Sequence, residues 1–239
     1  FVASSLLGLV AFAGRFCMPA AEPERRLAPA PARLLLAPPF RRQTVVLFTV
    51  LTLHMAGFWC VYAELPVQLM RLHRVPVHEV GWFQLQVNAV HVVADVWFGW
   101  LAARHGRLRT FVVCLVFAAG QAVVLGRLGD VGSDFERFTL AVALMGIGAG
   151  TWSCFGALFG AHYPATLRAT AAATAYALAR AVVLPLKPLV ASAFAATGSF
   201  APALWIGIGC ALGSAAAVLL LPRGDTPVEL LDDDERRSV

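Results

Sequence analysis

Residues 138–162 read FTLAVALMGIGAGTWSCFGALFGAH and contain no Asp, Glu, Lys or Arg. About 20 mainly apolar residues are enough for a helix to cross the ~30 Å hydrocarbon core of a bilayer. Windows of the same kind follow one another along the chain at 44–64, 80–102, 110–127, 171–195 and 200–221. Together the six windows predict an all-α membrane protein.

The composition argues against a soluble globular enzyme. Hydrophobic residues make up 59% of the 239 residues and charged residues 14%, with a mean hydropathy of +0.72. Soluble domains average about 45–50% apolar and about 25% charged residues. The net charge of +5 lies almost wholly between the apolar windows. This placement favours a membrane-topology signal over a nucleic-acid-binding patch.

The rest of the chain divides around the six windows. Residues 1–14 are apolar but only ~21 Å long as a helix, and no basic segment precedes them, so we interpret them as a truncated transmembrane helix rather than a signal peptide. Residues 15–43 hold six of the 14 prolines and six arginines, which predicts a linker. A six-helix unit over 44–222 follows, and residues 223–239 form a charged tail.

Basic residues are unevenly distributed between alternate sides of the windows. With the linker placed in the cytoplasm, that side carries thirteen arginines and the opposite side four, while Arg180 and Lys187 fall inside a window. Cytoplasmic loops of membrane proteins are enriched in Lys and Arg, so the count predicts a cytoplasmic linker and a cytoplasmic C-terminus. We expect a multi-pass protein of the cell inner membrane.

Polar side chains form a stripe along the window 80–102. Gln84, Asn88, His91 and Asp95 recur at spacings of four, three and four, which places them on one helical face. Polar groups inside a membrane usually face a cavity or another helix. The stripe predicts either a wet substrate path or interhelical hydrogen bonding, and we favour the path because His91 and Asp95 can titrate.

The window 171–195 carries a second polar face, of opposite charge. Tyr176, Arg180 and Lys187 lie at i, i+4 and i+11, again on one side of a helix. Two prolines flank Lys187 and free backbone carbonyls there, as in the broken helices of transporters.

Two interpretations of these cations stay open. In the first, Arg180 helped by Lys187 binds a substrate carboxylate, because a guanidinium makes bidentate hydrogen bonds to carboxylates. In the second, the cations pair internally with Asp95 or with Glu64, at the outer end of the window 44–64. Both can hold in different conformations.

The window 44–64 also contributes aromatic and imidazole side chains. We expect His54 to line the substrate path. Trp59 and Tyr62 are either cavity walls or anchors at the membrane interface.

Glycines recur at short intervals in the window 138–162. Gly146 and Gly150 form a small-xxx-small pair, which is typical of closely packed membrane helices. The windows 110–127 and 200–221 are nearly all apolar, and we expect them to be lipid-facing supports.

No catalytic constellation emerges from the sequence. It contains no nucleophile–base set and no phosphate-binding loop after a strand, and the five cysteines are scattered without a CxxC pattern. His73 and His78 have no third metal ligand near them, so solvated loop histidines are the better interpretation. We therefore expect no enzyme, no cofactor and no metal.

Two connections between the windows resemble motifs of the major facilitator superfamily. The stretch 99–109, GWLAARHGRLR, is similar to the loop signature G-x-L-A-D-R-x-G-R, which occurs between the second and third helices of a half. The matching residues are Gly99, Leu101, Ala102, Arg104, Gly106 and Arg107. Ala103 stands where the family has Asp.

The second motif covers residues 163–170, YPATLRAT, and continues into the following window. It resembles the E-x-[FY]-P-T-x-x-R-A-T…Y-x-x-x-R stretch of the sugar and organic-acid proton symporters, before and within the eleventh helix. The matching residues include Pro164, Arg168, Tyr176 and Arg180. Ala161 replaces the acid of the family pattern.

The resemblance covers nearly the whole chain and implies the C-terminal half of a transporter, with a separate N-terminal half as its partner. It implies a truncated sixth helix at 1–14, the central linker at 15–43 and helices seven to twelve within 44–222. Such halves are built from three-helix inverted repeats and hold the substrate near mid-membrane. The second motif looks most like transporters of sialic acid, aromatic acids and other carboxylates.

The resemblance and the two polar faces together suggest roles for individual residues. The expected function is secondary active, proton-coupled uptake of an organic anion by alternating access. Substrate contacts are expected at Arg180, Lys187, Tyr176, His54, Gln84, Asn88 and His91. The coupling proton is expected on Asp95 or His91. A cytoplasmic gate is expected at Gly99, Arg104, Gly106, Arg107, Pro164 and Arg168.

Two rival functions are compatible with the sequence. Proton-antiport efflux of drugs or metabolites fits the same fold, although cationic drugs would suit acidic residues better than Arg180 and Lys187. A non-transporting membrane scaffold or fragment is the rival from another class, because one half cannot alternate access alone. The expected partners are a small organic anion, protons, the lipid bilayer and the missing half, and not nucleic acid.

Overall fold

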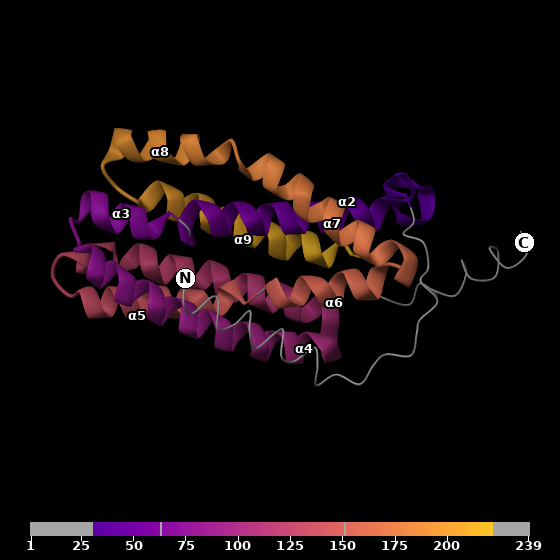
Figure 1. Cartoon of the computed structure of the whole chain (residues 1–239), viewed down its shortest axis with the longest axis horizontal. Coiled ribbons are helices and arrows are strands. Elements are labelled where there is room, and N and C mark those ends of the chain that lie inside the picture. The colour runs from indigo at the N-terminus through magenta and orange to yellow at the C-terminus, as the bar shows by residue number, and fades with distance from the viewer. Residues whose placement is uncertain (1–30, 63, 151, 222–239) are drawn as a thin grey trace, which may run out of the picture.

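The structure is a computed structural model that describes residues 31–62, 64–150 and 152–221, without the side chains of 101–107. Within these ranges the chain is helical almost throughout and contains no strand (Figure 1). In chain order the elements are η1 (Ala32–Leu36), α2 (Pro38–Gly57), η2 (Phe58–Tyr62), α3 (Leu65–Leu72), α4 (Val77–Gly126), η3 (Leu128–Val131), α5 (Phe135–Ala149), α6 (Trp152–His162), α7 (Ala165–Val183), α8 (Leu186–Thr197) and α9 (Ala201–Leu219).

Successive helices join into longer segments that can cross a bilayer. In the described part of the chain, five segments are long and apolar enough: Pro38–Leu72, Leu108–Gly126, Phe135–His162, Ala165–Thr197 and Ala201–Leu219. The chain is therefore an all-α, multi-pass membrane protein, which confirms the predicted fold class at this level. The expected helix at 1–14 and the tail at 223–239 lie outside the described residues.

Helix α4 contains the two predicted windows 80–102 and 110–127, and it folds back on itself between them. Val87 lies beside Gly146 of α5, and Phe117 lies beside Gly148 of the same helix. A straight helix would hold residues 87 and 117 ~45 Å apart, so both cannot meet neighbouring turns of α5 unless α4 reverses. Figure 1 shows this reversal of the ribbon.

We call residues 77–100 the first arm of α4 and Leu108–Gly126 the second arm. The two arms lie on α5 in opposite directions. The first arm is nevertheless absent from the five apolar segments found in the described residues. Its polar stripe lowers its mean hydropathy, and such a helix is stable in a membrane only among polar neighbours or beside a cavity.

Glycines of α5 and its C-terminal boundary let both arms approach closely. A Cβ atom added at Gly148 would overlap the backbone of Phe117 in the second arm. A Cβ atom added at Gly150 would lie 2.9 Å from the carbonyl carbon of Ala94 in the first arm. The close packing predicted for the window 138–162 is therefore confirmed.

Helix α9 lies inside the bundle against α2 and α4. The fully buried Ser214 hydroxyl donates a hydrogen bond to the Val50 carbonyl over 3.0 Å. A Cβ atom added at Gly57 would lie 3.2 Å from the carbonyl oxygen of Gly207, so α2 and α9 cross at two glycines. The opposite face of α9 exposes Trp205, Leu212 and Leu219, so this helix has one buried face and one exposed apolar face.

Prolines and one glycine mark the helix ends. Pro38, Pro66 and Pro202 occupy the first two positions of α2, α3 and α9, where a missing backbone N–H leaves no helical hydrogen bond unmade. Gly198 follows α8 with a φ of 62°, a left-handed conformation that suits glycine. Its N–H donates to the Phe194 carbonyl over 2.9 Å, which closes the last turn of the helix.

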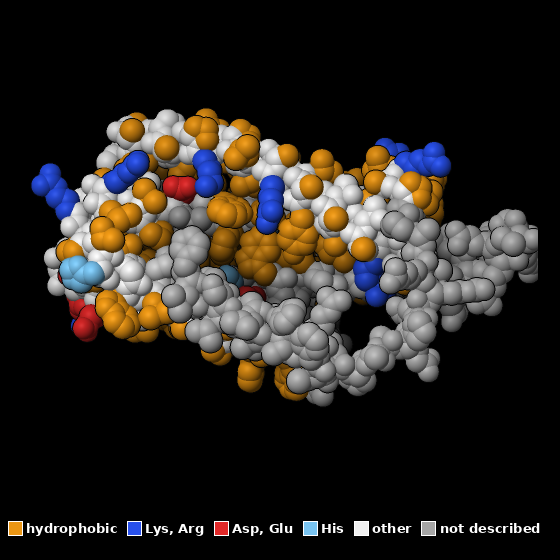
Figure 2. All heavy atoms as spheres, viewed as in Figure 1, with side chains coloured by type: hydrophobic (Ala, Val, Ile, Leu, Met, Phe, Trp, Pro, Cys, Tyr) orange, Lys and Arg blue, Asp and Glu red, His pale blue; other side chains and the backbone are white. Residues whose placement is uncertain are grey.

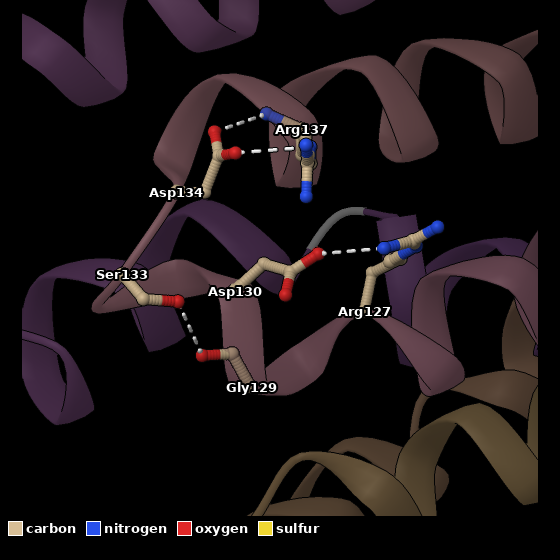
Figure 3. Close-up of polar contacts among 6 residues, drawn as sticks. All are labelled: Arg127, Gly129, Asp130, Ser133, Asp134 and Arg137. Atoms are coloured by element: carbon tan, nitrogen blue, oxygen red, sulfur yellow. Dashed lines mark hydrogen bonds and ion pairs between the residues drawn. The ribbon is translucent and has the colours of Figure 1, made fainter.

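The connection between α4 and α5 is fixed by two carboxylates (Figure 3). Asp134 accepts a hydrogen bond from the Arg137 backbone N–H over 3.1 Å and lies 3.0 Å from Arg137 Nε. Asp130 lies 3.3 Å from Arg127 Nη1, and Ser133 donates to the Gly129 carbonyl over 3.4 Å. The Asp134 cap satisfies a free donor at the start of α5, so it helps to set where that helix begins against α4.

The substitution Gly148→Ala tests the close approach of α5 to the second arm. The added methyl group overlaps the Phe117 backbone, so we expect the free energy of unfolding to fall by about 1–3 kcal/mol. Thermal or denaturant unfolding of the purified chain in detergent measures this change. Gly156→Ala is the matched control, because a Cβ there meets no described atom within 4 Å. Equal stability of the two variants would contradict the packing.

Candidate functional site

The first arm of α4 turns its polar stripe toward η2. Asn88 Oδ1 accepts hydrogen bonds from Gln84 Nε2 over 3.1 Å and from the Tyr62 hydroxyl over 3.4 Å. One turn further along the arm, His91 Nε2 lies 3.4 Å from Asp95 Oδ2. The four stripe residues therefore form two contacting pairs along one face of the arm.

Aromatic rings connect this stripe to α7. The His91 ring lies 5.6 Å from the Tyr62 ring and 6.0 Å from the Phe58 ring, measured between centroids. Phe58 meets Trp152 of α6 edge-on at 5.3 Å, and Trp152 stacks on Tyr176 of α7 at 6.2 Å. These rings form a continuous row across η2, α6 and α7, which we call the aromatic row.

A cavity of about 410 Å³ lies where α7 joins α8. Its lining consists of Trp59, Arg180, Val183, Leu184 and Lys187. Pro185 lies between the two helices, and its missing N–H ends the helical hydrogen-bond ladder there. Arg180 precedes this break and Lys187 follows it, yet both side chains line the same cavity.

Lys187 and Arg180 differ in how their charges are matched. Lys187 Nζ lies 3.4 Å from Glu64 Oε1 and 5.0 Å from the centroid of the Trp59 ring. Among the described residues, no carboxylate lies within ion-pair distance of Arg180. The internal ion pair that the sequence suggested is therefore formed by Lys187 and Glu64, whereas Arg180 is exposed and pairs with none of the described carboxylates.

Tyr176 lies between the two charged regions of the site. On α7 it lies one helical turn before Arg180, and its ring stacks on Trp152 of the aromatic row. Asp95 Oδ2 lies 3.4 Å from His91 Nε2, and no ion pair joins Asp95 to Arg180 among the described residues. The aromatic row from Tyr176 through Trp152 and Phe58 to His91 is therefore the described connection between the cavity and the stripe.

The space-filling view shows the surroundings of these groups. On the face drawn in Figure 2, basic side chains follow α7 and α8 above a broad hydrophobic area, and one carboxylate lies among them. A cavity of this volume is within the range of about 300–1,000 Å³ that is usual for small-molecule sites. Its apolar walls and few charged groups suit a small organic ion.

The π-helix η2 supplies a residue to each part of the site. Phe58 belongs to the aromatic row, Trp59 lines the cavity, and Tyr62 bonds to the stripe. At its start the Phe58 N–H donates to the carbonyls of both His54 and Met55. Turns of π-helix are rare and often occur at functional sites, where they redirect side chains.

His54 lies deeper than the sequence suggested. Its side chain is fully buried and is surrounded by the rings of Phe117, Trp152 and Phe155, with centroids 5.2 to 5.6 Å away. Neither ring nitrogen has a hydrogen-bond partner among the described residues. The structure therefore places His54 behind the aromatic row and not in the wall of the cavity.

The residues of the expected gate are only partly described. Gly99 packs against Ser153 of α6, since an added Cβ would lie 3.3 Å from the serine Cβ. Pro164 begins the α7 region as its N-cap, and Arg168 Nη2 donates to the Gly160 carbonyl over 3.0 Å. Arg104, Gly106 and Arg107 lie within residues 101–107, where the structure describes the backbone but not the side chains.

The sequence analysis missed the cavity-lining Val183 and Leu184 and two rings of the aromatic row, Phe58 and Trp152. Each of the two rings lies in an apolar window, so nothing in the sequence separates it from a lipid-facing ring. The spacing of Phe58 to Tyr62, one helical turn, is the single signal that could have indicated a shared face with Tyr62. No comparable signal marks Trp152.

Fold and site define a class of protein: an all-α, multi-pass membrane protein with a polar stripe, an aromatic row and a cation-lined cavity. Within the described residues, no three His, Cys, Asp or Glu side chains gather as a metal site. No protein-family model matches the chain, and no curated protein is significantly similar to it.

Cysteine labelling tests the different positions of Leu184 and His54. In a background without the five native cysteines, we expect a water-soluble anionic thiol reagent to modify Leu184→Cys, which lines the cavity beside Arg180. The reagent should leave His54→Cys unmodified, because that side chain is fully buried. Comparable labelling rates at the two positions would contradict the arrangement of the site.

Proposed function

We propose that this chain is the C-terminal half of a major-facilitator secondary transporter, and that the transporter takes up an organic anion together with protons by alternating access. The observation that carries the proposal is the unpaired Arg180 in the wall of a 410 Å³ cavity. A guanidinium without a counter-ion is costly in a membrane, and an anionic ligand removes that cost.

The chemistry of the cavity favours a carboxylate. Arg180 presents a planar fork of donors that matches the two oxygens of a carboxylate. Trp59, Val183 and Leu184 give the cavity apolar surface for the rest of the ligand. Tyr176 lies one helical turn before Arg180 on α7 and would add a neutral hydroxyl donor or acceptor.

The coupling proton is assigned to the His91–Asp95 pair. Both groups titrate, and they lie in one membrane arm at 3.4 Å, where the charge of either depends on the other. Asn88 and Gln84 continue the stripe and provide hydrogen-bonding groups along the same face. The aromatic row links this pair to Tyr176, one helical turn before Arg180, and this contact would give proton and substrate a means of influencing one another.

The remaining parts of the proposal rest on the sequence. The resemblance of 99–109 and 163–170 to two superfamily loops supports the family and a cytoplasmic gate formed by these connections. The distribution of arginines supports a cytoplasmic linker and C-terminus in a cell membrane. The N-terminal half of the transporter would then close the open side of the site.

The substitution Arg180→Ala tests the carboxylate site. Removing a charged hydrogen-bond donor should weaken uptake of a radiolabelled carboxylate such as benzoate by about 10- to 100-fold in kcat/KM. The measurement is uptake into proteoliposomes that hold the transporter under an inward proton gradient. Arg137→Ala, in the connection of Figure 3, is the control and should transport normally. Undiminished uptake by Arg180→Ala would remove Arg180 from the site.

The substitution Asp95→Asn tests proton coupling separately. The amide cannot accept a proton at physiological pH, so we expect loss of uphill accumulation driven by a proton gradient. Exchange of external for internal benzoate, which needs no net proton movement, should persist. If gradient-driven accumulation survived with unchanged dependence on pH, Asp95 would not carry the proton.

A further inference from the structure

The Glu64–Lys187 ion pair divides the cations of the cavity into two kinds. Lys187 is held on one side by Glu64 at 3.4 Å and on the other by the face of Trp59 at 5.0 Å. Arg180 lines the same cavity and has no ion-pair partner within the described part of the chain. We infer that Glu64 determines substrate charge: it occupies Lys187 so that the site binds monocarboxylates and rejects dicarboxylates.

This inference rests on the proposed function, because it assumes that Arg180 binds a carboxylate. Within the described cavity region, the charges of Arg180, Lys187 and Glu64 leave a net charge of +1. One carboxylate group neutralises that charge. A second carboxylate brings the region to a net charge of −1, and it can reach Lys187 only by competing with Glu64.

Displacing Glu64 is costly for two reasons. The Glu64 side chain is only 25% exposed, so without Lys187 it would lose its counter-ion in partly desolvated surroundings. The incoming carboxylate would also lie near the Glu64 carboxylate, and like charges at short range repel. Glu64 therefore acts against dianions both by occupying the lysine and by its own charge.

The geometry of the cavity places the second cation within reach of a small dianion. Arg180 and Lys187 lie on either side of the α7–α8 break, and both side chains line one cavity of about 410 Å³. An aromatic dicarboxylate bound at Arg180 would place its ring against Trp59, Val183 and Leu184 in the cavity that Lys187 also lines. A dianion is excluded by charge and not by size.

The test compares benzoate with isophthalate, which differ by one carboxylate on the same ring. Binding of each acid is measured by isothermal titration to the full chain in lipid nanodiscs at pH 7. The wild type should bind benzoate at least about tenfold more tightly than isophthalate. In Glu64→Gln the amide keeps the shape but leaves Lys187 unpaired, so isophthalate affinity should rise at least about tenfold while benzoate affinity changes less than about threefold.

Two further variants locate the effect in the ion pair. Glu79→Gln removes the same charge from an exposed position at the start of α4 and should leave both affinities as in the wild type. Glu64→Gln combined with Lys187→Gln removes both partners and should cancel the gain for isophthalate. Circular dichroism and thermal unfolding of each variant show whether it is folded.

The outcomes separate this inference from the function beneath it. If wild type and Glu64→Gln both bind benzoate through Arg180 but keep the same preference between the two acids, Glu64 does not determine substrate charge. The same conclusion follows if Glu79→Gln shifts the preference as much as Glu64→Gln. If no folded variant binds either acid, the carboxylate site itself fails, and the inference fails with it.

Discussion

The close approach of α5 to both arms of α4 is the constraint on which the rest of the structure depends. Gly148 lets the second arm reach the α5 backbone, and Gly150 does the same for the first arm. Helix–helix association in a membrane gains little from the hydrophobic effect, so van der Waals contact at such small residues supplies much of it. Because the first arm is pressed onto α5 by one face, its polar stripe is left to meet η2, and Asn88 and His91 come to lie against Tyr62.

The site follows from how each membrane charge is compensated. His91 and Asp95 contact one another inside the first arm, and Lys187 is held by Glu64 and by the face of the Trp59 ring. The groups in these pairs already have partners within the protein and do not need a ligand. By themselves they would suit a structural role as well as a transport role. Arg180 is different, because the described residues provide it with a cavity and no counter-ion. Lys187 has a carboxylate partner and Arg180 has none among the described residues. This difference, rather than the number of cations, is what favours a binding site over an internal ion-pair network.

Sequence periodicity predicted well where the helices lie along the chain. It predicted less well which face of each helix is turned toward the interior of the bundle. The apolar windows and the polar stripe were recoverable, because membrane length and a spacing of three to four residues are direct consequences of helix geometry. The pairing of Lys187 with Glu64 was one of two open alternatives, since both sit at helix ends whose relative depth the sequence leaves undefined. The burial of His54 and the buried face of α9 were not predicted. The sequence of an apolar helix does not show which of its faces contacts lipid and which contacts protein. The π-turn of η2 has no sequence signature of its own, so Phe58 was missed, whereas Trp59 and Tyr62 as cavity walls had been one of two open interpretations.

Two backbone irregularities meet at the cavity, and their positions explain why the ion pair matters. Non-helical or distorted backbone at membrane depth is tolerated where it is covered by protein or lines a cavity. The π-turn of η2 and the break between α7 and α8 lie side by side, since Trp59 of η2 contacts Lys187 of α8. Glu64 follows the π-turn of η2, and Lys187 follows the break between α7 and α8. Their ion pair therefore joins the start of α3 to the start of α8. Arg180 lies before its break, on the other side of the cavity. Under the proposed function, a ligand bound at Arg180 would sit beside the break between α7 and α8, and its charge would act on the nearby contact between Glu64 and Lys187.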